Sequence, residues 1–284
     1  MKVVTANLRK IYDFTLTNLV SNGLALRRPY GHYYLESDII SSRLHLQNFY
    51  SFFWPDVDEK AIANVEVYNL KGIKVHTENI ELNPFGQLYL EFKPICAKTN
   101  SFEGLVLVDL QPGKKIRKKF KEIPNPEKSL ISSPFWMSYR DWNDNYMYVH
   151  SISSIQHKFK GSLYPINELN NISNENRPTW KSWRLIDTYQ LKSVEIVLIN
   201  HSNKFGETKI QIWSNSNDLI DELPIMLKPF ETFRYKVSSS TFSKMEMINQ
   251  NLQIRVGVDP LLSPNGKPYV ILEYNNGPRS IHHG

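Results

Sequence analysis

Apolar and polar residues alternate along most of this chain, in short runs separated by turn residues. The alternation is clearest at 63–69 (ANVEVYN) and 86–92 (GQLYLEF). A period of two buries one face of a strand and leaves the other face in water. Turn residues lie between the runs. We therefore predict strands at 32–36, 42–49, 63–69, 73–82, 86–93, 104–110 and 134–139, and again at 193–200, 208–214, 218–227, 231–238, 252–258 and 268–274.

The segment 64–92 recurs later in the chain. A shift of 145 positions (209 − 64) places 209–237 on it without a gap. Few paired residues are identical, but their apolar positions coincide. The pairs include Val65 with Ile210, Val67 with Ile212, Ile80 with Ile225, Leu82 with Leu227, Pro84-Phe85 with Pro229-Phe230, and Leu88 with Phe233. This coincidence predicts an internal duplication.

The flanking segments match as well, at other offsets because the loop lengths differ. The matched positions are Asn48 with Asn200, Val108-Asp109 with Val258-Asp259, Pro134 with Pro268, and Val149-His150 with Ile281-His282. We expect an amino-terminal segment at 1–29, a first copy at 30–151 and a second copy at 152–284. Apolar residues at helical spacing favour a helix over 1–22, although an extended segment also fits.

Several short strands per copy, with frequent turns, indicate an all-β protein of two tandem β-sandwiches. The order of strand, Asn, strand, short turn, I-x-L-x-P-F and strand resembles Ig-like or fibronectin-like bacterial accessory domains. A double jelly roll predicts much the same strand count and alternation, so it remains the main alternative. The basic run Lys114–Lys121 and the residues up to about 133 have no match in the second copy, and we expect an exposed insertion there.

The composition of the chain says more about its cellular compartment than about its function. The chain has 284 residues, 41% of them hydrophobic and 12% aromatic, and a net charge of +6. Cys96 is the only cysteine, so no intramolecular disulfide can form. The first residues show no apolar run like that of a signal peptide, and no stretch approaches the length of a membrane-spanning helix. These features favour a cytoplasmic location.

Most enzymatic motifs are missing. The sequence has no GxSxG, no GxGxxG after a strand, no GxxxxGK[ST] and no HExxH. Cys96 lies in the loop-like KPICAKTN without an evident base beside it, which favours an idle thiol over a nucleophile. The basic run is narrower than the surface that nucleic-acid binding usually needs, so we do not expect nucleic acid as a partner.

Histidines recur at the boundaries of the copies. His32 opens the first copy, His150 closes it, and His282 and His283 close the second. Three imidazoles with one open position suit a catalytic Zn, Cu, Fe or Ni ion. The simpler interpretation is that each histidine forms hydrogen bonds at a strand end, because their spacing carries no short metal motif.

The loops before those histidines concentrate aromatic and polar residues. The first loop carries Arg140, Asp141, Trp142, Asp144 and Tyr146, and its counterpart carries Arg279. An aromatic ring can stack on the apolar face of a sugar while polar groups bind the hydroxyls, and sandwich domains bind ligands through their end loops. The alternative is that these rings close the ends of the sandwich core.

We therefore expect a non-catalytic binding or structural protein with a glycan or protein partner. A metal-dependent enzyme with its histidines at the junction of the copies is the first alternative. A structural subunit of a virion or surface assembly is the second. The oligomeric state does not follow from the sequence.

Overall fold

The structure is a computed structural model, and it describes the chain in parts. These parts are residues 30–120, 135–150, 152–153, 180–186, 191–201, 205–213, 218–238, 240–241, 243, 252–258, 268–275, 277 and 279–283. The amino-terminal segment 1–29, for which a helix is predicted, lies outside them. No helix in the described ranges is long and apolar enough to cross a membrane.

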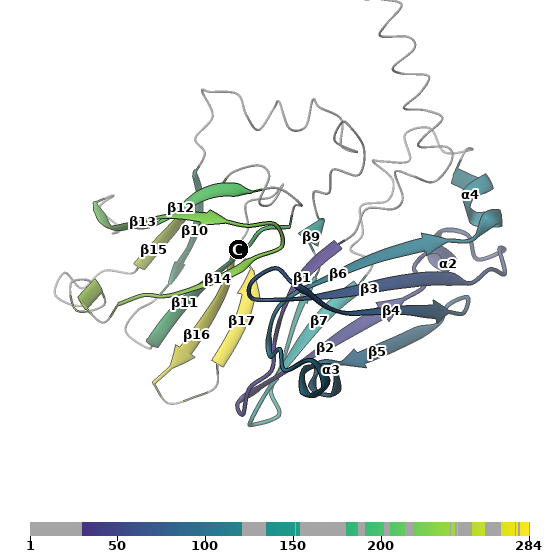
Figure 1. Cartoon of the computed structure of the whole chain (residues 1–284), viewed down its shortest axis with the longest axis horizontal. Helices are drawn as coiled ribbons and strands as arrows, with labels where there is room; N and C mark the ends of the chain where they lie inside the picture. The colour runs from purple at the N-terminus through teal and green to yellow at the C-terminus, as the bar shows by residue number, and fades with distance from the viewer. Residues whose placement is uncertain are drawn as a thin grey trace, which may run out of the picture.

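The first half of the chain forms two antiparallel sheets (Figure 1). Sheet A has the order β4 (Lys74–Leu82), β3 (Ala61–Asn69), β6 (Glu103–Pro112), β1 (Tyr30–Leu35) and β9 (Ile152–Ser153). Sheet B has the order β5 (Gln87–Glu91), β2 (Ile40–Gln47), β7 (Phe135–Asp141) and β8 (Tyr146–His150). Their inner faces share one buried core, as expected for a sandwich.

The second half repeats this arrangement. Sheet C has the order β10 (Trp180–Ile186), β15 (Leu252–Val258), β12 (Gly206–Trp213) and β13 (Leu219–Leu227). Sheet D has the order β14 (Thr232–Lys236), β11 (Leu191–Ile199), β16 (Tyr269–Tyr274) and β17 (Arg279–His283). The prediction of an all-β protein with two sandwiches is confirmed.

The register of the two halves agrees as well as the strand order. In the pairing of β3 with β4, Val65 lies opposite Glu78, and in the pairing of β12 with β13, Ile210 lies opposite Leu223. Both pairings shift register at the equivalent place, which is between Val67 and Tyr68 in the first half and between Ile212 and Trp213 in the second. In the two Pro-Phe turns, Phe85 and Phe230 both have a left-handed backbone, with φ of 54° and 60°. Descent of both halves from one duplicated domain stays a prediction.

Cross-strand partners correct two of the sequence matches. Val65 pairs with Val108 and its counterpart Ile210 pairs with Val256, so Val256, and not Val258, occupies the place of Val108. The error is two residues, which keeps the same face of the strand because side chains alternate with period two. The pairing of β11 with β16 puts Tyr269 in the place of Trp136, and the pairing of β16 with β17 then puts His283, and not His282, in the place of His150.

Two segments expected to be loops are helices. The segment that contains Cys96 forms α3 (Phe92–Thr99), which packs against β2 and β4 and buries Phe92, Ile95 and Cys96 at helical spacing. Pro94 falls in its first turn, where proline is tolerated, and Asn100 ends it with a left-handed backbone. Burial raises the pKa of the Cys96 thiol to about 12, as expected for an idle thiol.

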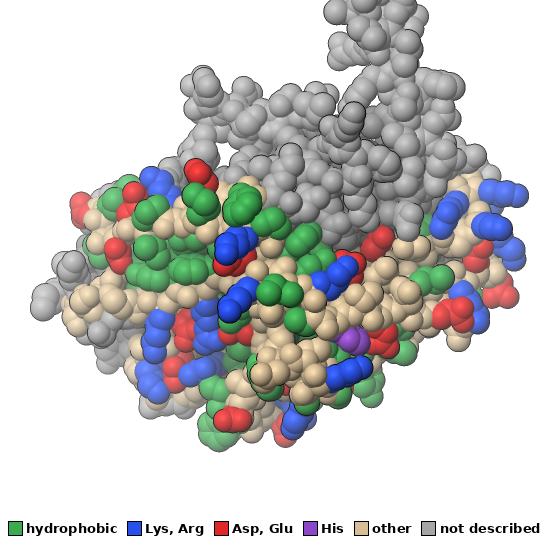
Figure 2. All heavy atoms as spheres, in the orientation of Figure 1, with side chains coloured by type: hydrophobic (Ala, Val, Ile, Leu, Met, Phe, Trp, Pro, Cys, Tyr) green, Lys and Arg blue, Asp and Glu red, His purple; other side chains and the backbone are tan. Residues whose placement is uncertain are grey.

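The basic run forms the second of these helices, α4 (Lys114–Phe120), so the expected exposed loop is wrong. The Glu59 carboxylate accepts hydrogen bonds from the backbone amides of Lys115 and Ile116, at 2.9 and 2.8 Å, and thereby caps the amino end of α4. The side chain of Ile116 is buried, while the Lys and Arg side chains of α4 gather at the surface (Figure 2). A third helix, α2 (Tyr50–Phe53), is one turn long.

The two halves share a core. Val197, Ile199, Tyr269, Ile271 and Ile281, on the outer face of sheet D, belong to the same cluster of buried residues as the core of the first half. The core between sheets C and D is a separate cluster. The second half therefore uses the outer face of one sheet to bind the first half.

Candidate functional site

The turn between β7 and β8 holds the tryptophan predicted to bind a ligand. The Asp141 carboxylate accepts hydrogen bonds from the backbone amides of Asn143 and Asn145 and from the Asn145 side chain, each at 2.9 Å. Asp144 adopts a left-handed backbone with φ of 60°. These constraints fix the turn and leave the side chain of Trp142 67% exposed. Trp142 therefore does not close the end of the sandwich core.

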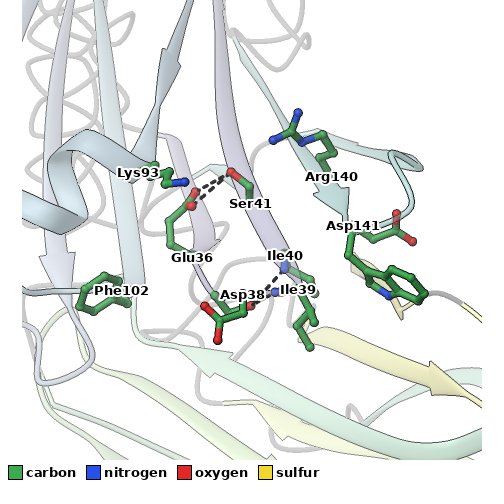
Figure 3. Close-up of a pocket in the computed structure, with 11 residues that line it drawn as sticks. Glu36, Asp38, Ile39, Ile40, Ser41, Lys93, Phe102, Arg140 and Asp141 are labelled. Atoms are coloured by element: carbon green, nitrogen blue, oxygen red, sulfur yellow. Dashed lines mark hydrogen bonds between the residues drawn. The ribbon is translucent and has the colours of Figure 1, made fainter.

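A hollow of about 420 Å³ lies on one side of this turn. Figure 3 shows Glu36, Ser41 and Lys93 on one side of this hollow and Arg140 and Asp141 on the other. Its side chains come from the β1–β2 connection and the start of β2, the start of α3, the α3–β6 connection, and the end of β7 with the turn that follows it.

Glu36 is a buried charged group in this hollow. Its carboxylate accepts a hydrogen bond from the backbone amide of Ser42 at 2.6 Å and from the Ser41 hydroxyl at 3.2 Å. Burial raises the pKa of Glu36, while these hydrogen bonds and the Lys93 amine oppose that shift. The carboxyl group is thus fixed in place by its neighbours.

A second hollow, of about 380 Å³, lies on the other side of the turn and shares Ile39 and Trp142 with the first. Most of its other walls come from the second half: Lys192 on β11, Glu273 on β16, Arg279 on β17 and the turn between β16 and β17. The first hollow lies within the first half, the second lies between the halves, and the two meet at Ile39 and Trp142. We call the two hollows together the inter-half groove.

Glu273 organises the charges in the second hollow. Its carboxylate accepts hydrogen bonds from Lys192 at 2.9 Å, from the Ser193 hydroxyl at 3.0 Å and from Arg279 at 3.2 Å. The hydrogen bond from Lys192, together with those from its other neighbours, lowers the pKa of Glu273 to about 2. Glu273 therefore stays ionised at neutral pH and holds both cations at the groove.

The structure brings together most of the predicted ligand-binding residues. Arg140, Asp141 and Trp142 line the first hollow, and Arg279 lines the second. Asp144 is exposed and lies 3.7 Å from Arg140, while Tyr146 is exposed on β8 outside both hollows. No signal in the sequence marked Lys93, Lys192 and Glu273, because they lie on a helix and two strands and not in loops rich in aromatic and polar residues.

The predicted metal ligands are not brought together. The His32 ring lies in the core, 6.4 Å from Phe135, whereas the His150 ring lies 6.2 Å from Trp136. Phe135 and Trp136 are adjacent on β7 and point to opposite faces of sheet B. His32, on β1 of sheet A, therefore lies against the inner face of sheet B, whereas His150 lies on its outer face. His282 lies on β17 opposite Val270, and His283 opposite Tyr269. Within the described ranges, no three His, Cys, Asp or Glu side chains are grouped closely enough to hold a metal ion.

The fold and the site together define an all-β protein of two β-sandwich halves with a tryptophan-edged polar groove between them. No protein-family model matches the sequence, and no curated protein matches it. Solved structures similar to it include Bacteroides uniformis β-glucuronidase 2, at 11% identity and a TM-score of 0.18, over 92% of this chain and 27% of that one.

Two further similar structures are of the same kind. A putative β-galactosidase from Bacteroides fragilis has 9% identity and a TM-score of 0.18, with coverage of 93% of this chain and 35% of that one. A glycosyl hydrolase family 2 member from Bacteroides cellulosilyticus has 9% identity and a TM-score of 0.16, with coverage of 90% and 28%. The chain thus spans about a third or less of these proteins, and similarity this low carries no argument about function.

Proposed function

We propose that this protein is a non-catalytic carbohydrate-binding protein that holds its ligand in the inter-half groove, against Trp142. One observation carries the proposal: a tryptophan that is 67% exposed stands between two hollows whose walls include charged and polar side chains. Leaving so large an apolar ring in water forgoes much of the stabilisation that its burial would give. A ligand with an apolar face that stacks on the Trp142 ring recovers this stabilisation.

Sugars match both properties of the groove. A pyranose ring presents C–H groups on its faces and hydroxyls around its rim, so it can stack on the indole while charged groups bind its hydroxyls. Arg140, Lys93 and Asp38 are exposed donors and acceptors in the first hollow, and Lys192 and Arg279 are donors in the second. Because the hollows lie on both sides of Trp142, the groove suits an oligosaccharide better than a single sugar.

The carboxylates favour binding over hydrolysis. Glycosidases usually need a pair of carboxyl groups, one of which gives up and takes back a proton. Of the four acidic residues that line the two hollows, Asp141 is held within its own turn, Glu36 is fixed by Ser41 and Ser42, and Glu273 is fixed by two cations and a hydroxyl. Only Asp38 is exposed, and one such group does not make a catalytic pair.

The test is a glycan-array screen, followed by titration calorimetry with the best oligosaccharide. We expect Trp142→Ala to weaken binding at least tenfold and to leave the unfolding transition unchanged, because the side chain is exposed. Phe205→Ala is the matched control, because Phe205 is equally exposed and lies outside both hollows. Absence of binding to any glycan, or equal affinity of the Trp142→Ala variant, would overturn the proposal.

A further inference from the structure

The outer face of sheet B carries aromatic rings where a solvated sheet usually carries small polar or charged side chains. Trp136, Tyr148 and Tyr89 are 42%, 62% and 60% exposed. Strand register places Tyr89, His45, Trp136 and His150 opposite one another, in one row across β5, β2, β7 and β8. We call this surface the aromatic face of sheet B.

The rings of this face support one another. The Trp136 and His150 rings lie 6.2 Å apart, the His45 and Tyr148 rings 5.6 Å apart. The His45 ring is also hydrogen-bonded to the Ser138 hydroxyl at 2.7 Å. The rings are tilted against one another by about 50° or more, so they form an interlocked surface and not a flat one. These contacts restrict rotation of the rings, which lowers the entropic cost of docking.

Charged groups flank the rings. The Arg43 guanidinium lies 4.6 Å from the centre of the Tyr89 ring and pairs with Glu91, the residue opposite it on β5. Arg140, at the other end of the face, lies 3.7 Å from Asp144. Aromatic rings at the centre with paired charges at the rim are typical of protein–protein interfaces. Nucleic acid would require basic groups without acidic partners.

The second half shows what covers this kind of face. On sheet D, the residues in the places of His45, Trp136 and Tyr148 are Val197, Tyr269 and Ile281, as the pairings of β11, β16 and β17 establish. All three are almost completely buried, and they pack against the first half. The same face of the equivalent sheet is therefore covered in one half and exposed in the other.

The covering surface belongs to strands of sheet A and their neighbours. The Tyr269 ring lies 5.0 Å from His32 and 5.8 Å from Tyr33, both on β1. Arg234 on β14 forms an ion pair with Glu103 on β6 at 3.2 Å. Sheet C of the second half has β10 and β15 in the places of β1 and β6. The chain thus contains both an uncovered copy of the docking face and counterparts of the strands that receive such a face.

We propose that the aromatic face of sheet B docks onto the second half of another copy of this chain, at β10 and β15, and so repeats between chains the contact that joins the two halves. Such an interface joins two different surfaces, so the association is head-to-tail and can continue along a row of chains. The proposal does not depend on the ligand of the inter-half groove.

The first experiment is sedimentation velocity on the full chain over a wide concentration range. We expect the sedimentation coefficient to rise with concentration, and Trp136→Glu and Tyr148→Glu each to weaken the association at least tenfold. Both side chains are exposed, so the variants should keep the wild-type unfolding transition. Phe52→Glu is the control, because Phe52 is about as exposed as Tyr148 but lies on α2, outside the row of rings that crosses sheet B.

A mixing experiment establishes the geometry. A Trp136→Glu chain labelled at its amino terminus still has an intact second half, so it should sediment faster when unlabelled wild-type chain is added. A face-to-face pair would need both aromatic faces, and the labelled chain would then stay monomeric. A labelled chain that stays monomeric in the mixture would overturn the proposal. The same holds for a wild-type chain that is monomeric at every concentration, and for association that survives both substitutions. A loss of glycan affinity in the Trp136→Glu variant without any change in association would also overturn it.

Discussion

Asn48 and Asn200 make the same contacts from equivalent places in the two halves. The side-chain amide of Asn48 donates to the carbonyl oxygens of Leu82 and Asn83, at 3.4 and 3.2 Å. That of Asn200 donates to Leu227 and Lys228, which lie 145 positions further along the chain, at 3.3 and 2.9 Å. Each asparagine thus ties the end of one strand of sheet B or D to the turn that follows β4 or β13.

We predict that Asn48→Ala lowers the free energy of unfolding by about 1–3 kcal/mol, because it leaves buried carbonyl groups without their donor. Urea denaturation followed by tryptophan fluorescence measures the change. Asn79→Ala, at an exposed position on β4, is the matched control and should change stability little. Equal stability of the two variants would show that the Asn48 hydrogen bonds make no net contribution to the free energy of unfolding.

Gly31 lies where the two halves approach each other closely. A Cβ atom at this position would lie 2.2 Å from Nδ1 of His201 and 3.1 Å from the Leu107 side chain. Since His201 is completely buried, its ring has little room to move. We predict that Gly31→Ala destabilises the protein by about 1–3 kcal/mol. Gly277→Ala, which meets no atom within 4 Å, is the control. Unchanged stability of Gly31→Ala in urea would show that the halves separate there at little cost.

His201 also predicts a dependence of stability on pH. Burial lowers its pKa to about 4 in the folded protein, against about 6.5 in the unfolded chain. The unfolded state therefore binds more protons between these values, so stability is complete above pH 6.5 and falls as the pH drops toward 4. The slope contributed by this group reaches about 1.4 kcal/mol per pH unit.

Urea titrations at several pH values between 7 and 4.5 test this prediction. Comparison with His201→Gln isolates the contribution of the imidazole, because other groups titrate in the same range; burial lowers the pKa of His45 too. The variant should show a shallower loss of stability with falling pH. Parallel curves for the two proteins would contradict the assigned role of His201.

Arg140 and Asp141 are neighbours whose substitution should have different effects. We predict that Arg140→Ala weakens glycan binding several-fold without loss of stability, since its side chain is exposed and its ion pair with Asp144 is at the surface. Asp141→Ala should lower stability by about 1–2 kcal/mol and also weaken binding, because its carboxylate holds the turn that positions Trp142. Calorimetric titration and urea denaturation separate the two effects. A stable Asp141→Ala variant with weakened binding would instead make Asp141 a direct ligand group.

Period-two alternation made most of the strands predictable, because in a sandwich each strand has one buried and one solvated face. The match between 64–92 and 209–237 supported these strand predictions, and Val65 and Ile210 do occupy the same register position in their sheets. α3 was missed because the alternation of β5 runs on into Phe92, where the helix begins. The period changes there from two to helical spacing within a few residues, too few for a clear pattern.

The site was predictable only where a loop concentrated unusual residues. Trp142 stood out among polar neighbours, and the fold does expose it. Lys192 and Glu273 gave no such signal, because a lysine and a glutamate on strands are ordinary, and only the packing of the halves brings them to the groove. The histidines share a place at the copy boundaries, but β1, β8 and β17 belong to three different sheets, which no pattern in the sequence indicated.

The core that joins the two halves has a consequence for folding. If the first half unfolded alone, Val197, Tyr269, Ile271 and Ile281 would pass from a nearly dry environment into water. That exposure is unfavourable, so the free energies of the two halves are coupled. We therefore expect a single heat-absorption peak with equal calorimetric and van't Hoff enthalpies. A fragment of the second half alone should aggregate through the surface that its missing partner normally shields.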